Sequence, residues 1–322
     1  MMAIRVWLLW ITVALGSFML PGPGQGQAPS VAAGGREASD VGKSPVAPPF
    51  PVHGPYPFRV GETLTYEFSF SRFPLSGKLG ELELSVVSLD TAQALTNALA
   101  TKLKRDLPRP DDSQPAEEAC PSALPSPGLA FQARARTRGF LPALLRVDVR
   151  HEYLSVVDAT DLGLTYNQRD LRNNQQQKFQ MTCQARARET RAVLEWAGQD
   201  GAVNLRTLPG RGWTTDLQTF WYVLRTQPLT PGSVIPMVLT EDERVYDLPV
   251  VVTGEVEVIK TRAGRFRTRK LDLKVRESGF VRYEGSFLLW LSEDAARLPV
   301  RVRFKARGVT VTGELTRYTT PR

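Results

Sequence analysis

The sequence predicts a mainly β protein: a curved antiparallel sheet, open half-barrel or sandwich, with one amphipathic helix at about residues 215–226 packed against it. Three observations support this fold class. Apolar and polar residues alternate along many short segments, one stretch has a helical spacing of apolar residues, and Gly or Pro separates many segments. Alternation with a period of two is typical of antiparallel strands with one buried and one solvated face.

The alternation is clearest near the start of the predicted domain. In GETLTYEFSF, Leu64, Tyr66 and Phe68 share one face, and ELELSV repeats the pattern. It returns in FQARART, VVVTGEVEV, KLDLKV, PVRVRFK and VTVTGEL. We therefore expect one β-rich domain over residues 58–318, in which strands outnumber helices.

The helix is predicted from a capping pattern and an apolar stripe. Thr215 and Gln218 fit a capping box, in which each side chain satisfies a backbone N–H at the helix start. Pro228 prevents the helix from continuing. The apolar face has helical spacing and consists of Leu217, Phe220, Trp221 and Leu224.

Three segments are predicted to lie outside the sheet. Residues 1–28 have a basic start, an apolar run and small residues at candidate cleavage sites, which is typical of a signal peptide. Residues 29–57 are rich in Pro, Gly and Ala and predict a disordered linker. A Pro-rich insertion covers about residues 91–128, and its first part, TAQALTNALATKLKRDL, can form a short surface helix.

The predicted signal peptide indicates an exported protein, periplasmic or secreted, and the alternative is an N-terminal membrane anchor. An oxidising compartment would allow Cys120 and Cys183 to form a disulfide. Cys183 equally fits an ordinary buried cysteine on a strand. The sequence leaves these two interpretations open, because it does not determine the distance between the two residues.

The chain is basic, with a formal charge of +8 and a pI of about 9.6. Cations alternate with apolar residues, so they occupy the opposite strand face. A solvated outer face is the favoured interpretation, and contact with an anionic envelope surface is the alternative. Nucleic acid is not an expected partner, because an exported chain does not meet it and no basic motif with interleaved aromatics is present. The candidate cations are Arg134, Arg136, Arg186, Arg188, Arg301 and Arg303.

No catalytic residue, metal site or cofactor is predicted. The polar cluster at Ser292, Glu293 and Asp294 in FLLWLSEDAARLPVRVRFK has the composition of a turn between two strands. The acids at residues 241–243 are also expected in a solvated turn, and Asp216 is expected at a helix start, where the helix dipole favours its negative charge. His151 has strand-like neighbours and no metal-ligand spacing around it.

Five stretches in order resemble an uncharacterised bacterial envelope family, domain of unknown function 3108. They are FRVGETLTYEFSF, TDLQTFWYVLRTQPLTPG, EVEVIKTRAGRFRTRKLDL, FLLWLSEDAARLPVRVRFK and GVTVTGELTRY. The resemblance implies an exported, mostly antiparallel β protein, a curved sheet or open half-barrel with a helix set against it. It implies no reaction, cofactor or partner.

The aromatic helix leads to the functional hypothesis. A half-barrel incompletely closed by the helix would leave an apolar groove for a lipid-like ligand, and the protein would be a non-catalytic binding or carrier module. The alternatives are a structural, partner-binding β scaffold with a filled core and a carboxylate-based envelope hydrolase. The groove candidates are Trp213, Leu217, Phe220, Trp221, Leu224 and Trp290.

Overall fold

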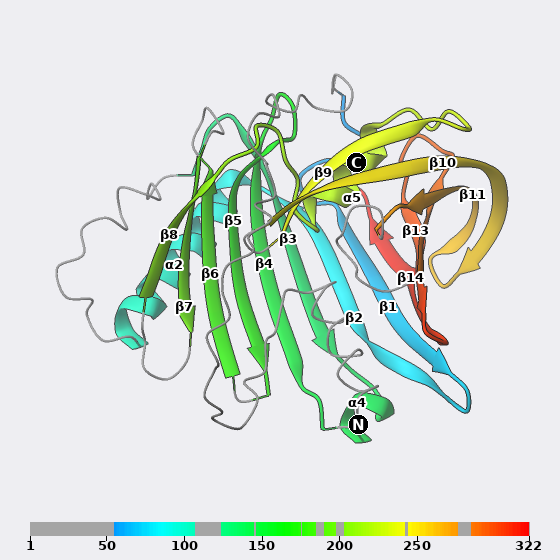
Figure 1. Cartoon of the computed structure of the whole chain (residues 1–322), viewed down its shortest axis with the longest axis horizontal. Coiled ribbons are helices and arrows are strands. Elements are labelled where there is room, and N and C mark those ends of the chain that lie inside the picture. The colour runs from blue at the N-terminus through cyan, green and yellow to red at the C-terminus, as the bar shows by residue number, and fades with distance from the viewer. Residues whose placement is uncertain are drawn as a thin grey trace, which may run out of the picture.

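The computed structural model confirms a mainly β protein with few helices (Figure 1). The parts of the chain that it describes are residues 55–106, 124–144, 146–174, 176–184, 190–197, 203–241, 244–275 and 285–321. The predicted signal peptide, most of the predicted linker, Cys120, Arg186 and Arg188 lie outside these residues.

Fourteen strands form one antiparallel sheet. In chain order they are β1 (Thr63–Arg72), β2 (Leu75–Val87), β3 (Gly128–Thr137), β4 (Val149–Asp158), β5 (Leu164–Asn173), β6 (Gln176–Gln184), β7 (Thr190–Ala197), β8 (Val203–Pro209), β9 (Val234–Glu241), β10 (Arg244–Thr261), β11 (Gly264–Leu273), β12 (Gly285–Ser292), β13 (Pro299–Ala306) and β14 (Val309–Thr319). The helices are α2 (Leu89–Asp106), α4 (Phe140–Leu144) and α5 (Thr219–Thr226).

The strand order is β8-β7-β6-β5-β4-β3-β2-β1-β14-β13-β12-β11-β10-β9, so the sheet is two meanders joined where β1 pairs with β14. β8 and β9 are the two ends of this order and do not pair, which leaves the sheet open rather than closed into a barrel. The sheet curves, and β9 and β10 pass across the concave side of β3 to β5 (Figure 1).

The segment before α5 links the edge strand β9 to β5 in the other meander. Thr215 forms a parallel bridge with Leu239, and its N–H donates to the carbonyl of Val238 (2.8 Å). On the other side, Leu164 of β5 donates its N–H to the carbonyl of Thr214 (2.8 Å). This short segment therefore satisfies backbone groups of two strands that are far apart in the sheet.

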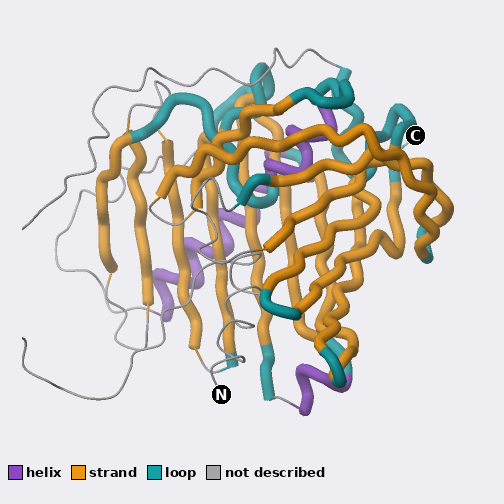
Figure 2. The backbone as a smooth tube through the Cα atoms, turned by 45° about the vertical axis from the view of Figure 1, so that its right-hand side comes forward, coloured by secondary structure: helices purple, strands orange, loops and turns teal. Residues whose placement is uncertain are grey.

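The main core lies inside the curve, and α5 is part of it. Buried aliphatic and aromatic residues of both meanders pack around Phe220, Val223 and Leu224. A smaller cluster covers the outer face, where Ala92 of α2 packs against Ala130 of β3 and its neighbours. α2 and α5 thus lie on opposite faces of the sheet (Figure 2). No helix in the described ranges is both long and apolar enough to cross a membrane.

The predicted capping box of α5 is wrong, and the helix begins at Thr219 rather than near Thr215. Gln218, the residue before the helix, makes no side-chain cap hydrogen bond, and the Thr215 hydroxyl donates to the carbonyl of Val238. Asp216 performs the capping role instead, because its Oδ1 accepts the N–H groups of Gln218 (3.2 Å) and Thr219 (2.8 Å). The Thr215 hydroxyl is used in a hydrogen bond to β9, and the spacing of residues in the sequence does not reveal this contact.

The polar cluster between β12 and β13 is a turn, as predicted. Asp294 accepts the N–H of Ala296 (3.1 Å), and Ser292 accepts the N–H of Leu298 (2.7 Å). Glu293 pairs with Arg267 and with Arg269 (2.7 Å). The hydrogen bond from Arg267 lowers the pKa of Glu293 below its ordinary value. The Asp294 carboxylate therefore stabilises the turn backbone, and the Glu293 carboxylate ties the turn to β11.

Candidate functional site

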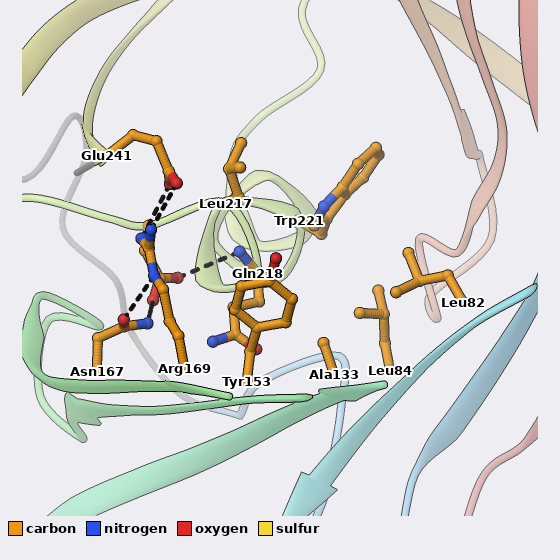
Figure 3. A pocket seen from close by; sticks show the side chains of 11 residues that line it. Leu82, Leu84, Ala133, Tyr153, Asn167, Arg169, Leu217, Gln218, Trp221 and Glu241 are labelled. Carbon is orange, nitrogen blue, oxygen red and sulfur yellow. Dashed lines mark hydrogen bonds and ion pairs between the residues drawn. The ribbon is translucent and has the colours of Figure 1, made fainter. Parts of the chain in front are cut away.

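A pocket lies between the N-terminal turn of α5 and the inner face of β2 to β5 (Figure 3). Its empty space, part of which is open to solvent, is about 370 Å³. The enclosed part is narrow, so a bulky group can enter only if side chains at the rim move. The lining residues are Leu82, Leu84, Ala133, Tyr153, Asn167, Arg169, Asp216, Leu217, Gln218, Trp221 and Glu241.

The lining has two chemically different sides. Figure 3 shows Glu241, Arg169 and Asn167 on one side, and Trp221, Leu82 and Leu84 on the other. The polar residues come from β5 and β9, and the leucines come from β2. A molecule that fills this pocket meets polar atoms at one end and hydrocarbon at the other.

Asp216 is buried at the polar side of the pocket, at the start of α5. Besides capping α5 with Oδ1, its Oδ2 accepts the hydroxyl of Ser155 and the amide Nδ2 of Asn167 (2.6 Å). The Thr219 hydroxyl is a further donor to Oδ1 (2.8 Å). These donors from β4, β5 and α5 compensate the cost of burying the charge and tie the helix start to the sheet.

Arg169 and Glu241 form a second buried polar unit. The two side chains are bidentate, with Nη1 to Oε1 at 2.6 Å and Nη2 to Oε2 at 3.0 Å, and both are almost inaccessible to solvent. Arg169 Nε also donates to Asn167 Oδ1 (2.9 Å), which joins this pair to the Asp216 cluster. The expectation that Glu241 lies in a solvated turn was wrong, because the last residue of β9 faces β5 across the interior.

Gln218 presents an unpaired acceptor at this site. Its Nε2 donates to the Ser155 hydroxyl oxygen, whose own proton is donated to Asp216. The Ser155 oxygen also accepts the Asn167 amide Nδ2 (3.0 Å), so three polar side chains meet at this hydroxyl. The other amide atom, Gln218 Oε1, is buried with no hydrogen-bond partner among the described residues. An acceptor in this condition costs free energy until a donor meets it.

The predicted groove residues divide between pocket and core. Leu217 and Trp221 are half-buried and line the pocket. Trp213, Phe220 and Leu224 are buried in the main core and do not belong to the lining. The Trp213 indole N–H donates to the carbonyl of Asp161 (2.9 Å).

Trp290 is buried in the wall formed by the second meander. It pairs across the sheet with Lys270 and Arg301, and the Arg303 guanidinium carbon lies 5.1 Å from its ring centroid. This is a cation–π contact within the wall, and the residue does not line the pocket.

The far end of α5 is anchored by a buried ion pair. Arg225 donates to both carboxylate oxygens of Glu62, at 2.5 and 2.9 Å, and the two side chains are 0% and 1% exposed. Arg225 also donates to the carbonyls of Ala296 (3.0 Å) and Pro57 (2.9 Å). The helix that forms one side of the pocket is therefore attached to the sheet at both ends.

The described cations of the outer face lie beside acids of neighbouring strands. Arg134 lies 3.7 Å from Glu83, and Arg136 lies 3.0 Å from Glu81. Arg301 pairs with Glu314 at 2.6 Å. The Arg303 guanidinium lies over the Trp290 ring, so each described candidate cation has a partner within the sheet.

His151 is buried on β4, where its ring nitrogens contact Asn173 (3.1 Å) and the Tyr153 hydroxyl (3.3 Å). Within the described ranges, no group of three or more His, Cys, Asp or Glu is placed to hold a metal ion. Cys183 is buried and disulfide-bonded. Its pairing with Cys120, which lies outside the described residues, stays a prediction.

Sequence reasoning missed the polar side of the pocket. Ser155 belongs to β4, and Asn167 and Arg169 belong to β5, where all three side chains are buried. In the sequence of β5, the apolar residues Leu164 and Tyr166 alternate onto the strand face opposite to Asn167 and Arg169, and only Leu171 shares their face. Alternation alone therefore does not assign this amide and this guanidinium to the interior.

The profile of the family described as protein of unknown function (DUF3108) matches residues 123–316, more than half of the chain. The chain belongs to this family. No curated protein matches the DUF3108 chain at a significant level.

Two solved structures are similar to the DUF3108 chain. One is a beta-barrel-like protein of domain of unknown function DUF1849 from Brucella abortus, at 10% identity and a TM-score of 0.48, with 82% of this chain and 99% of that chain covered. The other is a candidate lipoprotein from Parabacteroides distasonis, at 9% identity and a TM-score of 0.26, with 82% and 98% covered. At identities this low, neither similarity extends to function.

Proposed function

We propose that this DUF3108 chain is an exported, non-catalytic envelope protein that binds one amphipathic, lipid-like molecule in the pocket beside α5. The observation that supports it best is the two-sided lining, in which leucines and Trp221 face a polar wall with an unpaired acceptor, Gln218 Oε1. Ligand pockets are mostly apolar with a few placed polar groups. Export is supported by the N-terminal segment.

The polar wall also indicates which head group fits. Arg169 is already neutralised by Glu241, and the Asp216 carboxylate lies in the same wall. A carboxylate head would therefore meet no free cation, whereas a hydroxyl or amide N–H can donate to Gln218 Oε1. We expect a neutral, hydroxyl-bearing amphiphile such as a monoacylglycerol to bind more tightly than the fatty acid of the same chain length.

A non-catalytic role is supported by the state of the two carboxylates. Asp216 receives donors from Ser155, Asn167 and α5, and Glu241 is held by both guanidinium nitrogens of Arg169. General acid–base catalysis needs a carboxyl group that can reach and exchange a substrate proton. The second candidate function is a partner-binding scaffold, which the packing of Trp213, Phe220 and Leu224 into the core favours.

Native mass spectrometry tests the proposal on protein purified gently from its own host. We expect a stoichiometric apolar mass that is lost on denaturation, and a monoacylglycerol that restores it better than a fatty acid does. The Ala133→Leu variant fills the pocket and should reduce the bound fraction, whereas Ala263→Leu, at a half-buried alanine outside the lining, should not. A bare protein in every mild preparation, with no affinity for either lipid, would favour the scaffold.

A further inference from the structure

Exposed apolar side chains gather at one end of the sheet, away from the pocket. Phe73 is 98% exposed and Leu75 is 58% exposed at the turn between β1 and β2. Phe140 is 80% exposed and Leu144 is 60% exposed on α4. α4 lies beside the first part of β2, where Gly139 contacts Lys78, and Figures 1 and 2 draw it at the same end of the sheet as this turn. We call these four residues the tip surface.

The tip surface rests on ordered backbone. The Arg138 N–H, just before α4, donates to the carbonyl of Leu79 in β2 (3.0 Å). Beneath the turn, Phe70, Leu79 and Val309 form a small core of their own. The exposed phenyl rings therefore project from a supported platform, and their exposure costs free energy in water that a nonpolar contact would recover.

The same turns are rich in cations. Residues 71–79, 138–148 and 306–309 contain Arg72, Lys78, Arg138, Arg146 and Arg307, against a single acid, Asp148. Asp148 pairs with Arg150 (3.3 Å), Lys78 pairs with Glu67, and Lys78 and Arg138 share Glu81. With Glu67 and Glu81 included, the five cations still outnumber the acids, so the net charge of these turns is positive. Positive charge around projecting phenylalanines is the combination by which peripheral proteins attach to anionic lipid.

We propose that the tip surface docks on an anionic lipid bilayer, with Phe73 and Phe140 inserted among the head groups. The apolar residues stand on two separate projections, a hairpin turn and a one-turn helix, rather than on a flat patch. A penetrable lipid surface accommodates two projections, whereas a protein partner would need a matching hollow for each. This interaction is independent of the ligand pocket, so either proposal can fail without the other.

Vesicle flotation tests the docking with protein purified from its own host. We expect co-flotation with vesicles of phosphatidylcholine and phosphatidylglycerol, weakened by salt, and much less with phosphatidylcholine alone. The Phe73→Ser/Phe140→Ser variant should bind about tenfold or more weakly. The matched control, Val258→Ser/Tyr318→Ser, changes exposed apolar residues elsewhere and should bind like the parent. Equal binding of both variants and the parent would overturn the proposal.

A second measurement separates the tip surface from any contribution of the apolar N-terminal segment. Brominated lipids should quench extra fluorescence in Phe73→Trp and none in Val258→Trp. Absence of added quenching at position 73 would overturn the docking. So would sedimentation velocity showing that Phe73→Ser/Phe140→Ser dissociates a dimer, because the occupant of the tip surface would then be a second copy of the chain.

Discussion

Arg225 and Glu62 show how strongly a single pair of residues can depend on the fold. Each side chain is removed from water, and the guanidinium also lies 5.3 Å from the Phe58 ring centroid and 5.5 Å from that of Tyr222. Burying two charges is costly, and only complete pairing makes it tolerable. The pair therefore specifies where the C-terminal end of α5 sits more than it adds net stability.

At this scale, Glu62→Gln should lower the free energy of unfolding by about 3–5 kcal/mol, because it leaves the Arg225 charge buried and uncompensated. Urea denaturation measures the loss. Glu314→Gln is the matched control, since it breaks a partly exposed pair with Arg301 and should cost about 1 kcal/mol or less. The double variant Glu62→Leu/Arg225→Met should be more stable than Glu62→Gln. Similar losses in the buried and exposed pairs would contradict this interpretation.

At the scale of the element, α5 is short and owes its position to its ends. Asp216 caps its first turn and joins it to β4 and β5, while Arg225 holds its last turn. A helix of this length is marginal by itself in water, so tertiary contacts supply most of its stability. The same contacts determine the width of the pocket, since Leu217, Gln218 and Trp221 belong to α5 or immediately precede it.

Two alanine variants at the start of α5 should therefore differ sharply. Thr215→Ala removes one hydrogen bond to the Val238 carbonyl and should cost about 1 kcal/mol. Asp216→Ala removes the cap and leaves buried donors of Ser155, Asn167 and Thr219 unpaired, which should cost about 3 kcal/mol or more. Thermal and urea unfolding compare them. A larger loss of unfolding free energy in Thr215→Ala than in Asp216→Ala would contradict this assignment and favour the capping box that the sequence predicts.

At the scale of the whole molecule, one continuous sheet wraps a core that contains several buried tyrosines. Burial raises the pKa of Tyr166 to about 12, and burial raises the pKa of Tyr66 and Tyr222 well above their ordinary value. Tyr66 belongs to β1 and Tyr222 to α5, within the main core, whereas Tyr166 belongs to the cluster under α2. The folded chain thus keeps phenols neutral on both faces of the sheet.

This arrangement predicts alkaline destabilisation. Each raised phenol contributes stability that is fully present below pH 10 and is lost as the pH rises toward the folded-state value, because only the unfolded state ionises in that interval. The slope is at most about 1.4 kcal/mol per pH unit for each tyrosine. Urea unfolding between pH 8 and pH 11.5 measures this slope. Tyr166→Phe should reduce the slope by the contribution of one tyrosine, because phenylalanine does not ionise. A free energy of unfolding that is constant above pH 10 would contradict the prediction.

The strands and the helix could be predicted because their patterns are local. The alternation in GETLTYEFSF is β1, and the apolar stripe from Leu217 to Leu224 predicts α5 to within a few residues. The cap was misplaced because Thr215 and Asp216 are equally plausible caps by residue type, and the choice depends on β9, which takes the threonine hydroxyl.

The sequence by itself determined the fold class, the family and the buried face of clearly alternating strands such as β1, because these depend on periodicity and order along the chain. Only the tertiary structure decided which buried residues line a pocket and which fill the core. Phe220 and Trp221 are adjacent and are both aromatic, yet Phe220 is buried in the main core and Trp221 lines the pocket. The polar side of the pocket requires β5, β9 and the segment before α5 to meet. Arg169 pairs with Glu241, and Asn167 connects Arg169 to Asp216. The curvature of the sheet brings these residues together, and their spacing in the sequence does not.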